Sequence, residues 1–259
     1  MTYDITSSIV AYNNGLEIIK EAIQSFLNTE LNVKLYVIDN STSDHIKILC
    51  NDKRIEYIFN RANLGFGAGH NVAIRKCLGT SKYHLILNPD IYFEGGTLEK
   101  IYAYMEGHAD VGVAMPKIVY PDGSMQYLCK NLPTPFDLIF RRFIPNALKP
   151  AFQQRFDRYE FRDRNYDEIM DVPCLSGCFM FVRTSVFNEV GMFDKRYYMY
   201  LEDVDLFKRI GAKFRTVYYP EVSVNHHYDK GSYRSWKLLF YHIRSAIKYF
   251  NKWGWLPLH

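Results

Sequence analysis

The first half of the chain alternates short apolar runs with segments whose apolar residues recur at helical spacing. Four runs have the length of strands, and each is followed within two residues by Asn or Asp: residues 5–11, 33–38, 55–59 and 83–87. Between the first two, residues 16–27 place Leu16, Ile19, Ile23 and Phe26 on one face of a helix. Residues 72–78 are expected to form another helix. This alternation predicts an α/β fold with a mostly parallel central sheet flanked by helices.

The second half is less regular. Residues 111–120 are apolar and precede Pro121-Asp122-Gly123, a turn sequence that indicates a hairpin. Residues 130–170 are rich in aromatic and basic side chains and show no clear periodicity. Residues 178–182 are expected to form a buried strand, and a helix is expected from Glu202 to about residue 210.

The expected organisation is one domain followed by a helical extension. The domain covers residues 1–229, with a nucleotide-binding half over 1–110 and an acceptor-binding and catalytic half over 111–229. Residues 230–259 form a basic, amphipathic C-terminal extension, in which residues 234–258 read as a helix. Such a helix either lies on an anionic membrane surface or packs its apolar face on the domain. Both alternatives stay open at this point.

Composition narrows the class of protein. Charged residues make up 23% and apolar residues 48%, which is ordinary for a globular protein, while aromatic residues reach 16%. The net charge of +4 is too small to indicate a nucleic-acid partner. No run of about 18 apolar residues is present to cross a bilayer. The chain is expected to be cytoplasmic, because five cysteines without finger spacing and without a secretory leader indicate reduced thiols.

Two carboxylates follow apolar strands in the first half. In an open α/β sheet, ligands bind beyond the carboxyl ends of the strands, so Asp39 and Asp90 are expected at the same edge. Pro89 cannot donate to a strand ladder, so pairing should stop there and the chain should turn outward. Asp90, with Asn88 two residues before it, is then placed to bind a divalent cation and a diphosphate. Ordinary turn chemistry also explains Asn-Pro-Asp.

Acidic residues also begin the helix at residue 202. Glu202, Asp203 and Asp205 complement the helix dipole, which is a sufficient structural reason for their presence. The same dipole would keep Asp203 ionised at neutral pH, as a general base requires.

Glycines at positions 65, 67 and 69 precede the helix expected at 72–78. They read G-x-G-x-G and follow the third strand of the chain, whereas the dinucleotide fingerprint reads G-x-G-x-x-G after the first strand. A nicotinamide enzyme is therefore disfavoured. The glycines serve either turn geometry or the close approach of backbone to a ligand.

Six segments of this chain occur in an order that resembles the inverting family 2 glycosyltransferases of the GT-A fold, in particular their bacterial rhamnosyltransferase-like branch. The segments are YNN, VIDNSTSD, NLGFGAGHN, LILNPDIYF, LSGCFMFVR and GMFDKRYYMYLEDVDLFKRI, and they lie between about residues 5 and 226. The tail HIRSAIKYFNKWGW is also similar to that branch.

The resemblance implies roles for individual residues. Asp39 matches the acid that accepts from the N–H of a uracil or thymine ring, and Asp90 matches the last acid of the Asp-x-Asp motif, the ligand of Mn²⁺ or Mg²⁺. Asp203 matches the catalytic base. Glu202, beside Asp203, is implied as a second catalytic residue. The resemblance further implies nucleotide-sugar-binding roles for these residues: Tyr12, Asn13, Asn63, Gly65, Asn71, Asn88 and Gly177. His226 is implied as a third metal ligand, with His227 competing for that role.

The implied function is inverting transfer of a sugar, best rhamnose from dTDP-rhamnose and otherwise a sugar from a UDP donor. The acceptor is a glycan or lipid-linked saccharide of a bacterial cell-surface polysaccharide, met at the inner face of the plasma membrane. A non-catalytic carbohydrate- or nucleotide-binding protein of the same fold is the alternative from another class. A sugar nucleotidyltransferase would need a glycine-rich basic loop where this chain reads AYNNG, and a glycosidase would not need the pattern around Asp39.

Overall fold

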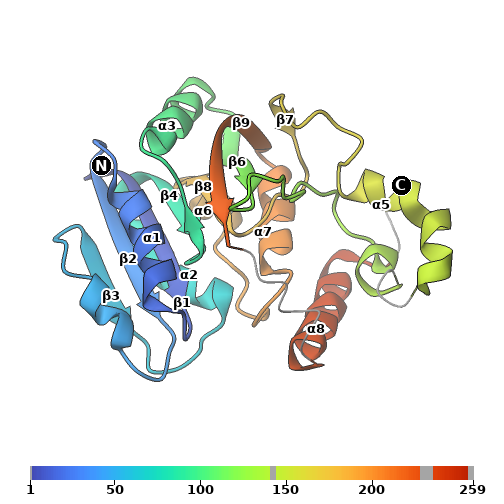
Figure 1. Cartoon of the computed structure of the whole chain (residues 1–259), viewed down its shortest axis with the longest axis horizontal. Coiled ribbons are helices and arrows are strands. Elements are labelled where there is room, and N and C mark those ends of the chain that lie inside the picture. The colour runs from blue at the N-terminus through green and yellow to red at the C-terminus, as the bar shows by residue number, and fades with distance from the viewer. Residues whose placement is uncertain (1, 141–143, 228–235, 256–259) are drawn as a thin grey trace.

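The computed structural model describes residues 2–140, 144–227 and 236–255. A nine-stranded mixed sheet forms the centre of the molecule (Figure 1), with the order β3-β2-β1-β4-β8-β6-β9-β5 and β7 paired to β9. The predicted α/β fold with a mostly parallel central sheet is therefore confirmed.

The N-terminal half of the sheet is parallel. It consists of β1 (Tyr3–Ala11), β2 (Val33–Asp39), β3 (Ile55–Phe59) and β4 (Ser81–Leu87). Its helical connections are α1 (Leu16–Leu27), the 3₁₀ helix η1 (His45–Leu49) and α2 (Phe66–Cys77). β1 pairs with β2 on one side and β4 on the other. The carboxyl ends of β2 and β4 consequently lie at the same edge of the sheet, as predicted for Asp39 and Asp90.

The second half of the sheet mixes directions. Its strands are β5 (Ile91–Tyr92), β6 (Val111–Val119), β7 (Met170–Asp171), β8 (Phe179–Arg183) and β9 (Arg215–His226). Its helices are α3 (Thr97–Gly107), α6 (Val186–Val190) and α7 (Glu202–Gly211). β8 runs antiparallel to both β4 and β6, whereas β6 and β9 are parallel. β8 thus joins the parallel N-terminal half to the rest of the sheet.

Residues 130–170, which have no periodicity in the sequence, form short helical pieces at one side of the molecule (Figure 1). These are the π-helical η2 (Phe136–Phe140), the 3₁₀ helix η3 (Asn146–Phe152) and α5 (Gln153–Tyr159). The turn predicted at residues 121–123 is present, with Tyr120 N–H donating to Ser124 O at 2.8 Å. A single antiparallel bridge, Val119 to Met125, follows that turn.

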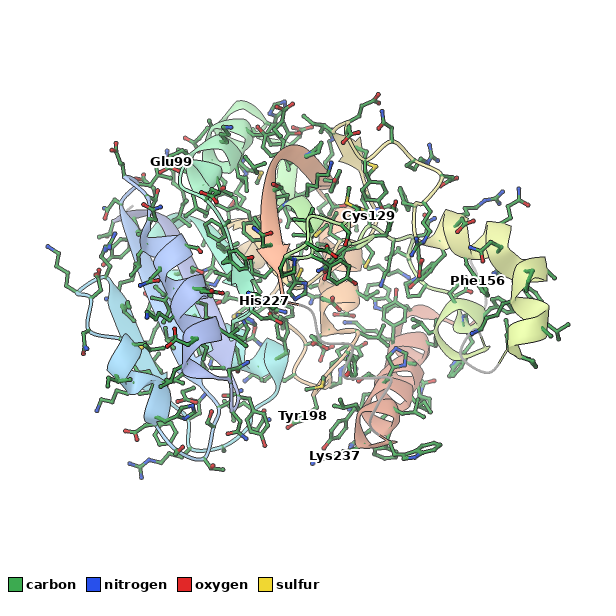
Figure 2. The ribbon with its side chains drawn as sticks, in the orientation of Figure 1. Glu99, Cys129, Phe156, Tyr198, His227 and Lys237 are labelled. Atoms are coloured by element: carbon green, nitrogen blue, oxygen red, sulfur yellow. The ribbon has the colours of Figure 1, made fainter. Side chains whose placement is uncertain are left out.

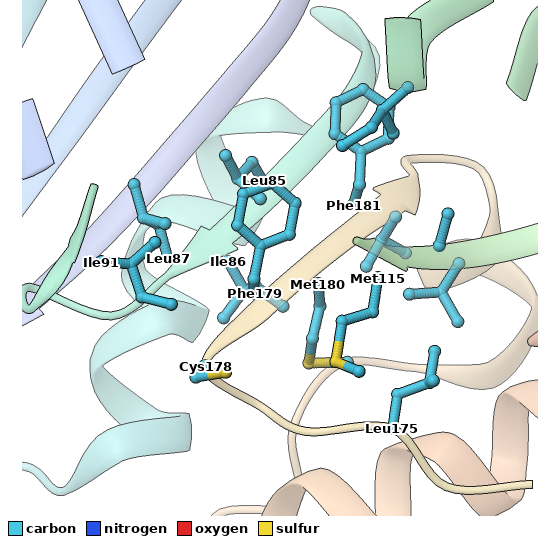
Figure 3. Packing of buried hydrophobic residues seen from close by; sticks show 14 of the residues in the cluster. Leu85, Ile86, Leu87, Ile91, Met115, Leu175, Cys178, Phe179, Met180 and Phe181 are labelled. Atoms are coloured by element: carbon cyan, nitrogen blue, oxygen red, sulfur yellow. The ribbon is translucent and has the colours of Figure 1, made fainter. Parts of the chain in front are cut away.

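The hydrophobic core lies where β4, β8 and β6 meet. Leu85, Phe179 and Phe181 are fully buried there, and Figure 3 shows their side chains projecting from β4 and β8 near one another. Met115 and Met180 are buried on the opposite face of the sheet, because they alternate with these positions along β6 and β8. Burying a Leu or Phe side chain contributes roughly 1.5–3 kcal/mol, so this cluster is a main source of the stability that fixes the sheet.

A buried chain of hydrogen bonds runs through the N-terminal half. Ser8 Oγ lies 2.7 Å from His70 Nδ1 and 2.9 Å from His84 Nε2, and Thr6 Oγ1 lies 2.8 Å from His84 Nδ1. Burial lowers the pKa of His84 to about 3 and the pKa of His70 well below its ordinary value. Both histidines are therefore neutral at physiological pH.

Two helices differ from expectation. α2 begins at Phe66, directly after Gly65, and not at residue 72. Gly67 and Gly69 lie inside this helix, and glycine fits there because a Cβ would come within 3 Å of the Phe193 side chain at position 67 and of the Val10 side chain at position 69. Helix α3 was not predicted, although Leu98, Ile101 and Met105 form its buried face.

The C-terminal helix α8 (Trp236–Trp253) packs on the domain. Only some of its apolar side chains take part in this packing, so a membrane surface stays open for the others. Its buried residues are Ser245, Ala246, Tyr249 and Phe250, which meet Tyr197 and Leu201. Three of the apolar residues stay exposed: Trp236 by 87%, Phe240 by 61% and Ile247 by 43%. The buried face is thus displaced from the one that the apolar pattern indicates.

Buried polar contacts fix α8 to α7. Trp253 Nε1 donates to Asp205 Oδ1 at 2.8 Å, and Lys252 Nζ lies 2.6 Å from the same oxygen. Arg209 pairs with the other oxygen of Asp205 at 3.0 Å. Asp205 is therefore a structural carboxylate.

All five cysteines are free thiols, and none is exposed. Within the described ranges, no helix combines the length and hydropathy that a membrane crossing requires.

Candidate active site

Asp39 is the last residue of β2 and is completely buried. Its Oδ2 accepts a hydrogen bond from the Tyr57 hydroxyl at 2.7 Å, and its Oδ1 accepts from the Ser41 N–H at 2.9 Å. Burial, and then the bond to Asp39, raises the pKa of Tyr57. The carboxylate is thus held in one orientation at the carboxyl end of the sheet.

Tyr12 and Asn13 lie beside Asp39, as the resemblance implies. Ala11 pairs with Asp39 across the two strands, and Asn40 N–H donates to Ala11 O at 2.9 Å. Asn13 has a φ of 54° and donates its N–H to Ser41 Oγ at 2.9 Å. Tyr12 is 50% exposed. An aromatic ring is therefore available next to the buried carboxylate.

Asn63 and Gly65 form a turn at the same edge. Asn63 Oδ1 accepts from Gly65 N–H at 2.9 Å, and Asn40 Nδ2 donates to Gly65 O at 3.3 Å. Gly65 has a φ of 86°, and a Cβ there would lie 2.2 Å from the carbonyl oxygen of Tyr198. This turn needs glycine because both its backbone conformation and its contact exclude a side chain.

Asn71 differs from the expectation of a nucleotide-sugar contact. Its side chain is fully buried in α2, with Nδ2 donating to Phe193 O at 2.8 Å and Oδ1 accepting from Phe193 N–H at 3.0 Å. Both ends of the amide are occupied, so Asn71 ties α2 to the loop before α7 and does not face a ligand.

Asp90 and His226 meet through strand pairing. Ile91 pairs with His226 where β5 joins β9, which places Asp90 Oδ1 3.4 Å from His226 Nε2. Gln126 fixes the imidazole, because its Nε2 donates to His226 O at 3.0 Å and its Oε1 lies 2.9 Å from His226 Nδ1. An amide oxygen only accepts, so Nδ1 carries the proton and Nε2 presents its lone pair towards Asp90.

The donor set of Asp90 and His226 fits a divalent cation. A carboxylate oxygen and a neutral imidazole nitrogen are both common ligands of Mn²⁺, and a partner on the far ring nitrogen is usual for ligating histidines. No described residue donates a hydrogen bond to Asp90 Oδ1. Among the described residues, no group of three or more His, Cys, Asp or Glu side chains is suited to hold a metal.

His227 and Asn88 flank this pair. His227 points elsewhere, since its Nε2 lies 3.0 Å from Glu21 Oε2 and its ring packs against Tyr92 at 5.0 Å between centroids. Asn88 is partly buried, and its N–H donates to Cys178 O at 2.8 Å. The strand pairing favours His226 over His227 as the partner of Asp90.

Asp203 lies in the first turn of α7 and contacts the segment before β8. Its Oδ2 accepts from Gly177 N–H at 3.1 Å, and its Oδ1 accepts from Val204 N–H at 2.8 Å. Burial raises the pKa of Asp203, while these two N–H groups and the charge of Lys130 oppose that rise. A carboxylate held in this way has the basicity and the orientation that a general base requires.

Gly177 is the closest neighbour of this carboxylate. A Cβ at position 177 would lie 3.0 Å from Asp203 Cβ and 3.1 Å from its Oδ2. The two residues directly before α7, Tyr200 and Leu201, are strained, because both have a φ of 68°. Such strain in non-glycine residues is concentrated at functional sites.

Glu202 has different surroundings from its neighbour. It is 5% exposed, and burial, reinforced by the charge of Asp203, raises its pKa to about 8. Its Oε2 has no hydrogen-bond partner among the described residues. Glu202 is therefore mostly protonated at neutral pH.

Three residues of this region were not identified from the sequence. Gln126 orients His226, Tyr57 binds Asp39, and the charge of Lys130 acts on Asp203. Lys130 is placed by backbone hydrogen bonds in both directions with Cys174, at 2.8 and 3.1 Å. No local motif marks these residues, because each reaches the site through contacts between distant strands.

A family model described as glycosyl transferase family 2 matches residues 8–191. The chain belongs to glycosyl transferase family 2. It is therefore a glycosyltransferase, of a family whose enzymes are inverting and usually metal-dependent.

Curated relatives of this glycosyltransferase include two rhamnosyltransferases. An N-acetylglucosaminyl-diphospho-decaprenol L-rhamnosyltransferase of Mycobacterium tuberculosis is 29% identical over 236 residues, covering 84% of this chain and 74% of its own. The rhamnosyltransferase WbbL of Escherichia coli is 26% identical over 252 residues, covering 93% and 91%.

Solved structures show the same fold. GalNAc-T7 with UDP, GalNAc and Mn²⁺ aligns with a TM-score of 0.67 at 14% identity, over 88% of this chain and 43% of its own. The mannosyltransferase PcManGT from Pyrobaculum calidifontis, in complex with GDP-Man and Mn²⁺, aligns with a TM-score of 0.61 at 15% identity, over 96% and 65%. The chain thus spans less than two thirds of either structure, and the GT-A architecture is common to all three.

Proposed function

We propose that this glycosyltransferase transfers rhamnose from dTDP-rhamnose, or otherwise a sugar from a UDP donor, to a glycan or lipid-linked saccharide. The observation that carries the proposal is the carboxylate of Asp203, held by the N–H groups of Gly177 and Val204 at the start of α7. The names of the two rhamnosyltransferase relatives support the choice of sugar.

In this proposal the nucleotide binds at the carboxyl ends of β1 and β2. The oriented carboxylate of Asp39 accepts the ring N–H of thymine or uracil, and Tyr12 packs against the base. The backbone of three further residues lies near the proposed nucleotide site: Asn13, Asn63 and Gly65. The donor diphosphate then extends towards Asp90, which follows the adjacent strand β4.

Asp90 and His226 would hold Mn²⁺ or Mg²⁺, and the bound ion would neutralise charge on the diphosphate leaving group. Gln126 keeps His226 in the tautomer that this binding needs. Asn88 stands where an acid is common in the family motif, so fewer negative charges face the diphosphate.

The transfer is a single displacement. Asp203 takes the proton of the acceptor hydroxyl, the hydroxyl oxygen forms a bond to the anomeric carbon, and the bond from that carbon to the diphosphate breaks. Attack from the face opposite the leaving group inverts the anomeric centre. Lys130 favours the ionised form of Asp203, which is the form that accepts the proton.

The acceptor is proposed to be met at the cytoplasmic face of the plasma membrane. Exposed Trp236 and Phe240 on α8, together with the cations of that helix, suit a lipid–water interface.

Calorimetric titration tests the donor assignment. Purified protein is titrated with dTDP and with UDP, each with and without MnCl₂, and so are Asp90→Ala, Asp203→Asn and a control, Asp163→Asn, at an exposed position. We expect metal-dependent nucleotide binding that Asp90→Ala abolishes and Asp203→Asn retains. In transfer assays Asp203→Asn should lower the rate roughly 10²–10⁴-fold. Binding of neither nucleotide by folded protein would refute the donor assignment.

A further inference from the structure

A basic cavity of about 330 Å³ lies between α8 and the loop that leads into α7. Four cations and two tyrosines line it: Lys195, Arg196, Arg244, Lys248, Tyr198 and Tyr241. Half of these come from the loop and half from the helix, about 50 residues later in the chain. The tertiary packing of α8 therefore creates this concentration of positive charge.

Most of that charge is not neutralised by protein. Asp194 is the nearby acid, and its carboxylate is shared between Arg196, at 2.5 Å, and Lys252, at 3.2 Å. Lys248 Nζ donates to the backbone oxygen of Arg196. Burial, followed by the charges of Arg244 and Arg196, lowers the pKa of Lys248. The group is thus a set of mutually repelling cations.

Two of the four cations are unpaired. Lys195 and Arg244 are exposed and make no hydrogen bond or ion pair with any residue in the described ranges. Positive groups that line one cavity without a carboxylate partner favour a phosphate or diphosphate, because guanidinium and ammonium donors can share its oxygens.

The basic cavity adjoins the active site. Tyr198 lines it with its ring, which packs on Tyr241 at 5.0 Å between centroids. The carbonyl oxygen of the same tyrosine lies against Gly65 in the nucleotide half. Ser245 Oγ of α8 donates to Met199 O at 2.8 Å, so the helix holds the loop that ends at Asp203.

Exposed aromatic side chains precede the cavity-lining residues of α8, and the ring of Phe240 lies 6.3 Å from that of Tyr241 between centroids. Trp236 and Phe240 precede Arg244 by two turns and one turn on α8 and are 87% and 61% exposed. Figure 2 shows Tyr198 and Lys237 at the same end of the molecule. Aromatic rings beside unpaired cations are typical of a surface that meets lipid chains and their headgroups together.

We propose that the basic cavity binds the diphosphate of a lipid-linked acceptor. Lys195 and Arg244 contact the diphosphate oxygens, and Trp236 and Phe240 contact the lipid. The donor diphosphate has its own place beside Asp90, so a second diphosphate site serves the other substrate. The inference rests on the proposed function for the identity of the acceptor, and one relative carries a diphospholipid in its name.

The test is a binding measurement that needs no turnover. Farnesyl diphosphate in neutral detergent is titrated into the full chain, with inorganic pyrophosphate as the headgroup alone and farnesol as the lipid alone. The variants are Lys195→Gln and Arg244→Gln. The matched control is Lys237→Gln, which removes an exposed cation of the same helix that does not line the cavity. Each variant is checked by thermal unfolding and by its affinity for dTDP.

We expect each cavity variant to weaken farnesyl diphosphate binding roughly 5- to 20-fold, and the control to leave it unchanged. Farnesol should bind weakly, and phosphatidylglycerol vesicles should not compete efficiently. Equal loss in Lys237→Gln would overturn the proposal, since it would indicate attraction by net charge. Tight binding of farnesol, or efficient competition by phosphatidylglycerol, would overturn it in favour of a general membrane contact.

This outcome can be separated from that of the proposed function. A protein that binds farnesyl diphosphate through Lys195 and Arg244 but transfers no sugar from dTDP or UDP donors would refute the donor assignment alone. Normal transfer to a diphosphate-linked acceptor with an unchanged KM in both variants would refute the cavity alone.

Discussion

Glu202 and Asp203 are neighbours in sequence, yet their carboxyl groups have different surroundings. Asp203 receives two backbone N–H groups and the field of Lys130, while Glu202 is buried with one oxygen unpartnered. The helix start explains both acids equally well at the level of sequence. Gly177 and Lys130, both brought from other segments of the chain, give Asp203 surroundings that Glu202 lacks.

Sequence patterns located the acids but not the residues that orient them. Asp39 and Asp90 were predicted at one edge because both follow apolar strands, and the parallel pairing of β1 with β2 and β4 confirms that. Gln126 was not predicted. It follows an ordinary turn, and its contact with His226 depends on how β9 lies beside the segment after β6.

Gln126 provides the first prediction, which concerns metal affinity. Replacing it with Leu removes the acceptor on His226 Nδ1, so the imidazole is free to rotate or change tautomer. We expect Mn²⁺ affinity in the presence of dTDP to fall roughly 10–100-fold, the usual effect of losing a partner of a ligating histidine. Mn²⁺ titration measured by calorimetry reports the change.

Gln126→Glu is the matched comparison, because a carboxylate also accepts from Nδ1–H. It should keep most of the affinity that Gln126→Leu loses. If Leu and Glu variants bind Mn²⁺ as the parent chain does, His226 is not a ligand.

At the scale of elements, the start of α2 and the buried face of α8 could not be predicted from the local sequence pattern. The glycines at 67 and 69 were interpreted as turn residues, yet they lie within α2. Glycine fits at these positions because the side chains of Phe193 and Val10 approach too closely for a Cβ. The apolar stripe of α8 left open whether it packs on the domain or on a membrane, and the structure buries Phe250 of that stripe while Trp236 and Phe240 stay exposed. Both outcomes depend on contacts between elements far apart in the chain.

Gly65 provides the second prediction. Alanine at this position meets both an unfavourable φ of 86° and the carbonyl oxygen of Tyr198, 2.2 Å from the new Cβ. Gly79 has a φ of 75° with nothing within 4 Å of a Cβ, so Gly79→Ala isolates the cost of the backbone conformation. That cost is about 1–2 kcal/mol.

Urea unfolding of both variants gives the difference. Gly65→Ala should be less stable than Gly79→Ala, and it should also weaken dTDP binding because the loop carrying Tyr198 has to move. Equal stability of the two variants would show that the loop yields without cost, contrary to the contact described.

Across the whole molecule, stability depends on pH through two buried groups of opposite effect. Burial raises the pKa of Glu202 from 4.5 to about 8, so the folded state binds a proton that the unfolded state releases between these values. Its stabilising contribution is complete below pH 4.5 and is lost as the pH rises through 8. His84 has a pKa lowered from 6.5 to about 3, so its contribution is complete above pH 6.5 and is lost as the pH falls towards 3.

These two effects, together with the lowered pKa of buried His70, predict a stability maximum near pH 6.5. Between pH 6.5 and 8 only Glu202 of this pair changes its protonation difference, so the free energy of unfolding should fall by up to about 1.4 kcal/mol per pH unit. Below pH 6.5 the two buried histidines, His84 and His70, outweigh the single glutamate, so stability falls again.

Glu202→Gln tests this balance because it keeps the shape of the side chain and removes its titration. Urea midpoints measured at pH 6.5, 7.25 and 8 should fall in the parent chain and stay level in the variant. The acid-side decrease should persist in Glu202→Gln, since it belongs to the histidines. A parent chain whose stability is constant from pH 6.5 to 8 would mean that Glu202 is ionised in the fold, and the assignment of a neutral acid beside the base would then be wrong.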